Sequence, residues 1–117
     1  MYLHNKSKYH NHKTTCDGIV FDSKLEARRW EQLKRMLAAG EIKNLQRQPS
    51  FILQPSFKKH NKTYRAIKYR ADFQYQTHDG KTVVEDVKGM ETEGFKLKKK
   101  MFEYQFPELS LVLVKKV

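Results

Sequence analysis

Two aspartates and a lysine in the middle of the chain have the types and the spacing of a metal-dependent hydrolytic site. Asp72 and Asp86 lie on either side of a short turn, and Lys88 follows Asp86 by two residues. Carboxylate oxygens, completed by water and a phosphate oxygen, are the ligands that Mg²⁺ and Mn²⁺ prefer. Such an ion polarises a phosphate and lowers the pKa of a bound water, while Lys88 would hold that water or the developing negative charge. Asp72, Asp86 and Lys88 are therefore candidate catalytic residues, with Mg²⁺ or Mn²⁺ as the expected cofactor.

The stretch of residues 69–89 is predicted to form a β-hairpin, and its turn decides which acids meet. With a three-residue loop at 78–80, Asp72 lies directly opposite Asp86, and their Cβ atoms are roughly 4.5 to 5.5 Å apart. A two-residue turn would instead place Asp72 on the same face as Glu85, which makes Glu85 the alternative metal ligand. We favour the three-residue loop because it gathers the two acids and the lysine on one face.

Strand alternation makes Asp86 and Lys88 neighbours on one face, whatever the register. Like charges directly opposite each other destabilise a sheet, so a bound cation would explain the pairing of Asp72 with Asp86. The alternative is that Lys88 only forms a salt bridge with one of these acids. The opposite face of the hairpin is predicted to carry the apolar side chains of Tyr69, Ala71, Phe73, Tyr75, Val83 and Val87.

Residues 23–40 have the pattern of an amphipathic helix. Ser23 is a favourable N-cap, and Gly40 follows the last residues with helical periodicity. The buried stripe is predicted to carry Glu26, Trp30, Leu33 and Leu37, with Leu25 and Met36 beside it.

Glu26 has two interpretations. In a capping box, its carboxylate reaches back to the backbone amide of Ser23. Alternatively, it points along the buried edge of the helix, where a carboxylate needs a hydrogen-bond donor or a cation. Local sequence does not decide between the two.

The composition indicates a polyanionic partner. The 117 residues contain 24 Lys and Arg against 13 Asp and Glu, which gives a formal net charge of +11 and a basic chain. No apolar run approaches the roughly 20 residues needed to span a bilayer, and no apolar segment follows the basic N-terminus, so we expect no membrane partner and a cytoplasmic location. The length allows one domain, expected at residues 18–117 after a basic arm at 1–17.

The N-terminal segment carries alternate histidines, and we interpret it as a phosphate-contacting segment rather than a metal site, because a flexible segment lacks rigid ligand geometry. Cys16 has no cysteine partner, and we interpret it as an inert thiol. Residues 41–57 are predicted to be extended pieces interrupted by Pro49 and Pro55.

Two further segments carry dense positive charge. Residues 58–70 alternate basic and aromatic side chains, which suits either a surface that follows a phosphate backbone or a solvated hairpin. A helix is predicted after Gly89 and ends at Pro107, and residues 109–114 are predicted to be a buried strand. The candidate DNA-contacting residues are Lys58, Lys59, Lys62, Arg65, Arg70, Lys96, Lys98, Lys99 and Lys100.

In its motifs and their order, the chain resembles a known superfamily. Asp72 followed by Asp86-Val87-Lys88 is similar to the P-D…(D/E)-x-K signature of PD-(D/E)XK nucleases, with Ala71 in place of the proline. The wider pattern resembles small phage-encoded proteins assigned to that superfamily, including phage Holliday junction resolvases. It runs from Gly18 to about Pro107, and its motifs are residues 18–26, 40–42, 45, 48–49, 69–73 and 85–89.

The resemblance implies an α/β fold with a restriction-endonuclease-like core, in which a central mixed sheet is flanked by helices in the order αβββαβ. It implies metal ligation by Asp72, Asp86, Glu26 and the backbone of Val87, and it favours the functional interpretation of Glu26. Gln48 matches a position that would lie in the outer shell of the site.

The expected activity is hydrolysis of phosphodiester bonds in DNA, on branched substrates such as Holliday junctions, by a homodimer that cuts two strands. Alternatives are a nicking or end-processing nuclease, a non-catalytic DNA-binding protein and an RNA-processing nuclease.

Overall fold

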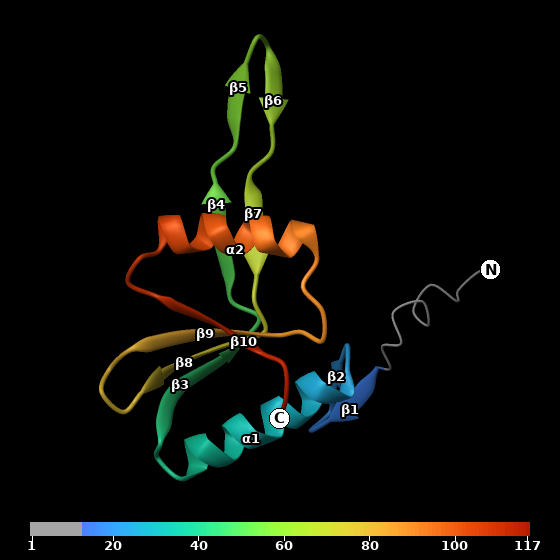
Figure 1. Ribbon diagram of the computed structural model, residues 1–117, viewed down its shortest axis with the longest axis vertical. Coiled ribbons are helices and arrows are strands. Elements are labelled where there is room, and N and C mark those ends of the chain that lie inside the picture. The colour runs from blue at the N-terminus through green and yellow to red at the C-terminus, as the bar shows by residue number, and fades with distance from the viewer. Residues whose placement is uncertain (1–12) are drawn as a thin grey trace, which may run out of the picture.

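The structure, a computed structural model, describes residues 13–117. This part of the chain forms two helices and ten strands, whose arrangement is shown in Figure 1. The helices are α1 (Lys24–Ala38) and α2 (Glu93–Gln105). The strands are β1 (Thr14–Cys16), β2 (Ile19–Phe21), β3 (Ile42–Arg47), β4 (Ser50–Gln54), β5 (Phe57–Lys59), β6 (Lys62–Tyr64), β7 (Ile67–Arg70), β8 (Phe73–Thr77), β9 (Thr82–Val87) and β10 (Ser110–Val114).

A four-stranded mixed sheet with the order β10-β9-β8-β3 forms the centre of the molecule. β10 is parallel to β9, whereas β8 is antiparallel to both β9 and β3. Along the chain, this sheet and its helices follow one another as α1, β3, β8, β9, α2 and β10. The prediction of an α/β fold with a mixed sheet and flanking helices is therefore confirmed.

Helix α1 begins and ends where local sequence predicts. The Ser23 Oγ accepts a hydrogen bond from the amide of Glu26 at 3.1 Å, which satisfies one of the amides left free at a helix N-terminus. At the other end, Gly40 adopts a φ of +78°, and the amide of Glu41 donates to the carbonyl of Met36 at 2.9 Å. The prediction that Leu37 belongs to the buried stripe is wrong, because Leu37 is 40% exposed. Near the end of the helix it is Met36 that packs against the hydrophobic core beneath α1.

Two hydrophobic cores lie on the two faces of the sheet. The first lies beneath α1 and includes Phe21, Leu33, Ile42, Phe73 and Tyr75, with Trp30, Val83 and Val87 packed against it. The second lies beneath α2, which crosses the β4–β7 ribbon (Figure 1), and includes Leu53, Tyr69, Ala71, Val84, Phe95, Phe102 and Leu111.

This division corrects the prediction that Tyr69, Ala71, Phe73 and Tyr75 share one face. β7 ends at Arg70 and β8 begins at Phe73, so the strand is interrupted at Ala71 and Asp72. Strict alternation holds only within one strand, and across the interruption the chain turns Tyr69 and Ala71 towards the core under α2.

Three smaller expectations have mixed outcomes. Pro49 and Pro55 separate β3, β4 and β5, as predicted.

β10 is an edge strand in which Leu111 is buried but Val112 is 43% exposed, so the expectation of a buried strand is wrong. Thr14–Cys16 lies within the predicted basic arm at residues 1–17, but it forms β1, which pairs with β2. The histidines of that segment, His4, His10 and His12, lie outside the described residues.

Candidate functional site

Asp72 and Asp86 lie opposite each other, because the hairpin has the three-residue loop. Phe73 pairs with Glu85 and Gln76 with Thr82, and the amide of Thr77 donates to the carbonyl of Lys81 at 2.8 Å. Gly80 takes a φ of +87°, the left-handed conformation that such a loop requires. Continuing this register by one residue places Asp72 opposite Asp86, so the predicted register is confirmed.

Asp72 is held on three sides by the backbone. Its carbonyl accepts from the amide of Gln48 at 2.8 Å, and its own amide donates to the carbonyl of Glu85 at 3.0 Å. Its Oδ2 accepts from the amide of Val87 at 2.7 Å. The carboxylate is thus fixed across β9 beside Asp86, and the backbone of Val87 takes part in the site through its N–H group. Gln48, predicted to be an outer-shell residue, supports Asp72 through the main chain.

Asp86 is 4% exposed and is enclosed by two partners. The Nζ of Lys88 lies 3.2 Å from its Oδ1, and the hydroxyl of Tyr69 donates to its Oδ2. Lys88 also lies over the ring of Phe95, 4.6 Å from its centroid, which directs its ammonium towards the carboxylate. The salt bridge between Lys88 and Asp86, the alternative considered in the sequence analysis, is therefore present. Tyr69 contacts Asp86 because the interruption after β7 turns its side chain to this face of the sheet.

Glu26 brings a third carboxyl from α1. Its side chain is 6% exposed and has no hydrogen-bond or ion-pair partner among residues 13–117. The capping-box bond from its carboxylate to Ser23 is not made, although the Ser23 half of the motif is. Burial, followed by the negative charge of Asp72, raises the pKa of Glu26 to about 7.

The three carboxyls influence one another electrostatically. Burial raises the pKa of Asp72 to about 6; the hydrogen bond from the Val87 amide opposes this rise, and the charge of Asp86 adds to it. Asp22 and Asp86 also raise the pKa of Glu26. Mutual repulsion of this kind is what a bound cation would relieve.

Glu85 belongs to a different cluster on the α1 face of the sheet. It is 1% exposed and accepts from the guanidinium of Arg29 at 2.7 and 2.5 Å, and from the hydroxyl of Tyr75 at 2.5 Å. These partners satisfy its charge, and the observed register turns it away from Asp72. The two-residue turn that would have made Glu85 the alternative ligand is therefore wrong.

Two charged residues that act electrostatically on Glu26, Arg47 and Asp22, were not among the site residues predicted from the sequence. The guanidinium of Arg47 lies over the ring of Phe21, 5.0 Å from its centroid, and its Nε is buried without a hydrogen-bond partner among the described residues. Its positive charge partly offsets the rise in the pKa of Glu26. Asp22 is exposed and pairs with Lys13 at 3.1 Å. The position of Asp22 directly before the N-cap Ser23 is the one sequence feature that could have indicated its proximity to Glu26.

The donor chemistry suits a hard divalent cation, whereas the described side chains do not form a complete ligand set. Within residues 13–117, no three Asp, Glu, His or Cys side chains converge closely enough to hold a metal ion. Mg²⁺ commonly binds through one or two carboxylates, with water and substrate phosphate in its other positions. Asp72 and Asp86 supply that minimum, and Glu26 is the third oxygen donor nearby.

The candidate DNA-contacting residues lie in two places. Lys58, Lys59, Lys62 and Arg65 lie on or beside the β5–β6 hairpin, and Arg70 ends β7; all are exposed. On α2, Lys96 is exposed and lies 3.7 Å from Glu93. Of the others on that helix, Lys98 and Lys100 are exposed and Lys99 is partly buried.

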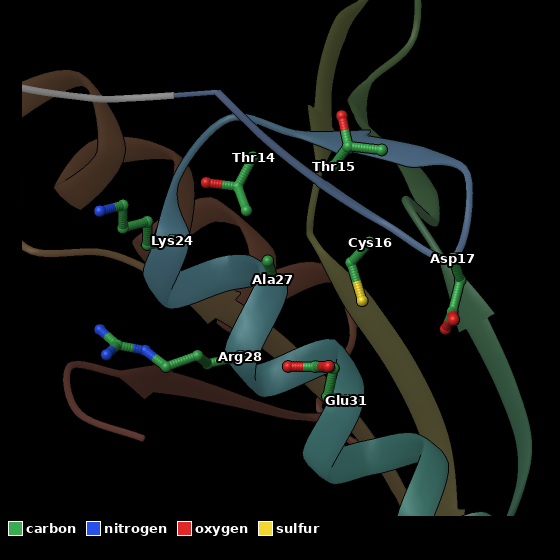
Figure 2. A pocket seen from close by; sticks show the side chains of 8 residues that line it. All are labelled: Thr14, Thr15, Cys16, Asp17, Lys24, Ala27, Arg28 and Glu31. Atoms are coloured by element: carbon green, nitrogen blue, oxygen red, sulfur yellow. The ribbon is translucent and has the colours of Figure 1, made fainter.

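A hollow of about 450 Å³ lies where β1 passes α1, and its lining does not include Asp72, Asp86 or Glu26 (Figure 2). Burial and the charge of Glu31 raise the pKa of the Cys16 thiol that faces it, which favours the unreactive protonated form. Its lining residues are Thr14, Thr15, Cys16, Asp17, Lys24, Ala27, Arg28 and Glu31.

A family model, described as protein of unknown function (DUF1064), matches residues 6–117. The chain belongs to the DUF1064 family. No curated protein and no solved structure matches it significantly. In this DUF1064 chain, no helix of residues 13–117 is long and apolar enough to cross a bilayer.

Proposed function

We propose that this DUF1064 protein is a divalent-metal-dependent DNA endonuclease that hydrolyses phosphodiester bonds. The observation that carries the proposal is the placement of Asp72 opposite Asp86, beside Lys88, in a chain with a net charge of +11. An acidic site on so basic a molecule is hard to explain as scaffold, since like charges across a sheet are destabilising. The resemblance to PD-(D/E)XK nucleases supports the same conclusion.

In this proposal, Asp72 and Asp86 would hold Mg²⁺ or Mn²⁺, and Glu26 would be the third carboxyl of the site. The ion, when bound, polarises the scissile phosphate and lowers the pKa of a coordinated water. The Val87 amide keeps the Asp72 carboxylate in place, and Lys88 holds the attacking water or the negative charge that develops on the phosphate. The basic surfaces bind the DNA backbone.

The substrate is branched DNA, such as a Holliday junction, and a homodimer would place two sites on the two strands to be cut. This part rests on the resemblance to phage resolvases. Such an enzyme would act in the cytoplasm, and in the host cytoplasm if a phage encodes it. A nicking or end-processing nuclease has the same chemistry.

A non-catalytic DNA-binding protein is the second candidate, and one observation favours it. Lys88 and Tyr69 already satisfy Asp86 without any ion. In that case the carboxyls only balance part of the positive charge.

A cleavage assay tests the first candidate against the second. The purified chain is incubated with junction, flap, linear and single-stranded DNA, and with RNA, in Mg²⁺ or Mn²⁺. We expect Asp86→Asn to lower the cleavage rate roughly 100-fold or more and to weaken Mn²⁺ binding measured by electron paramagnetic resonance. Glu103→Gln, which removes an exposed acid on α2, should change neither the cleavage rate nor Mn²⁺ binding.

The nuclease proposal fails if DNA is bound but never cut, or if Asp86→Asn cuts as fast as the parent. Cleavage of RNA alone would instead assign an RNA-processing role.

A further inference from the structure

The β5–β6 hairpin projects from the rest of the molecule as an arm, which we define as residues 57–64 (Figure 1). Every residue from Phe57 to Arg65 is exposed, and among residues 13–117 the two strands pair only with each other. At its tip, His60 and Asn61 both take positive φ values, 52° and 61°, as in the tight two-residue turns of hairpins. The arm therefore adds nothing to either hydrophobic core.

The arm has a uniform positive charge. Residues 57–70 contain six Lys and Arg residues and no Asp or Glu. Lys58, Lys59, Lys62 and Arg65 form no ion pair with any other described residue. Their charge is left for an external anion.

An aromatic pair stiffens the arm at its base. Phe57 and Tyr64 pair across the strands, and their rings stack with centroids 4.8 Å apart and an interplanar angle of 9°. The Nζ of Lys62 lies 5.2 Å from the centre of the Tyr64 ring. An isolated two-stranded hairpin is marginally stable in water. The stacked pair therefore helps to keep the hairpin extended, because no other described element packs against it.

We infer that the arm enters the major groove of double-stranded B-form DNA. That groove is about 12 Å wide and 8.5 Å deep and admits a two-stranded β-ribbon. The three residue steps from Phe57 to the tip span roughly 10 Å, which matches the depth. The lysines then face the phosphates on both walls, and His60 and Asn61 reach the base edges. Double-stranded RNA is excluded as the partner, because its major groove is too narrow for side chains to read.

This inference rests on the proposed function in taking DNA as the substrate, but the arm is separate from the carboxyls. The eleven residue steps from Asn61 to Asp72 span no more than about 40 Å even when fully extended. One turn of B-form DNA is about 34 Å long, so the arm would contact the duplex up to roughly one turn from the cleaved bond.

Binding measurements on matched charge variants test the inference. The full chain, in EDTA to prevent cleavage, is titrated by fluorescence anisotropy against one sequence as DNA duplex, RNA duplex and single strand. The arm variant is Lys58→Gln/Lys59→Gln/Lys62→Gln, and its control with the same net charge is Lys96→Gln/Lys98→Gln/Lys100→Gln on α2. Circular dichroism checks that both variants fold.

We expect the arm variant to bind DNA duplex more weakly than the α2 variant, with a slope of log K against log salt reduced by up to about 2.7 for three lost phosphate contacts. Bulky substituents on cytosine C5, which fill the major groove, should weaken DNA binding by the parent at least about fivefold and leave that of the arm variant unchanged. A minor-groove ligand such as netropsin should have little effect.

Equal binding losses for the two variants would overturn the inference, since charge alone would then explain them. So would an arm effect that is larger on single strands or RNA, or indifference of the parent to the cytosine substituents. If the arm effect is seen but nothing is cut, the nuclease proposal fails and this inference stands. If DNA is cut and the arm variant binds and cuts as the parent does, the inference alone fails.

Discussion

At the scale of single residues, the most informative side chain is a carboxyl without a partner among the described residues. Glu26 is buried beside Asp72, and burial and that charge both favour its protonated form. Buried acids in scaffolds are normally paired, as Glu85 is by Arg29 and Tyr75. The contrast between the two glutamates supports the proposed role of Glu26 as a metal ligand, whereas Glu85 is already satisfied by partners within the fold.

The raised pKa of Glu26 predicts how stability depends on pH. Without metal, the folded protein holds the Glu26 proton between pH 4.5 and about 7, whereas the unfolded chain releases it. The free energy of unfolding therefore falls as pH rises through this window, by up to about 3 kcal/mol for this group. We expect Glu26→Gln to be more stable than the parent at pH 8 by about 1 to 3 kcal/mol, and to lose this advantage near pH 4.5. Urea unfolding in EDTA at both pH values measures the difference.

Glu103→Gln is the matched control for this experiment, because it makes the same chemical change at an exposed position of α2. Its stability should follow that of the parent at both pH values. If the parent and Glu26→Gln keep a constant difference between pH 4.5 and 8, then Glu26 titrates normally, and it is not the buried, unpaired carboxyl that the proposed metal site requires.

At the scale of elements, one loop and one interruption build the site. The three-residue loop between β8 and β9 sets the register that brings Asp72 opposite Asp86. The interruption between β7 and β8 turns Tyr69 towards Asp86, a contact that an uninterrupted strand would forbid. Small backbone features thus decide which side chains meet.

Gly80 is the residue on which the loop depends. Its φ of +87° is unfavourable for any residue with a Cβ. We expect Gly80→Ala to lower the free energy of unfolding by about 1 kcal/mol, measured by urea denaturation. Gly89→Ala is the control, because Gly89 lacks a positive φ and an added Cβ would meet open space. Equal effects of the two substitutions would contradict the dependence of the loop on Gly80.

At the scale of the whole molecule, a small acidic site lies within a strongly positive field. The net charge of +11 attracts a polyanion, whereas Asp72, Asp86 and Glu26 repel any phosphate that approaches them. A cation between the carboxyls and the phosphate would resolve this opposition.

This opposition predicts that the effect of Asp86 on DNA affinity depends on whether metal is present. In EDTA, Asp86→Asn should bind duplex DNA roughly two- to fivefold more tightly than the parent, since one repulsive charge near the phosphate is removed. In Mg²⁺ the gain should vanish. Anisotropy titrations measure both, and Glu103→Gln reports the effect of losing a negative charge elsewhere. An Asp86→Asn affinity no higher than that of the parent in EDTA would mean that DNA does not pass close to these carboxyls.

Local sequence determined much of this protein. Ser23 and Gly40 mark the two ends of α1, and Gly80 with the flanking pattern predicts the loop and therefore the pairing of Asp72 with Asp86. These features depend on residues close in the chain, where capping, turn chemistry and alternation act directly.

The tertiary structure alone decided the contacts between distant segments. The pairing of Glu85 with Arg29, the hydroxyl of Tyr69 on Asp86 and the burial of Glu26 without a described partner all depend on separate elements coming together. No periodicity encodes them, because they arise only when α1 and α2 pack on opposite faces of the sheet. The outward projection of the arm is likewise a property of the fold, since a basic hairpin sequence does not say whether a neighbour covers it.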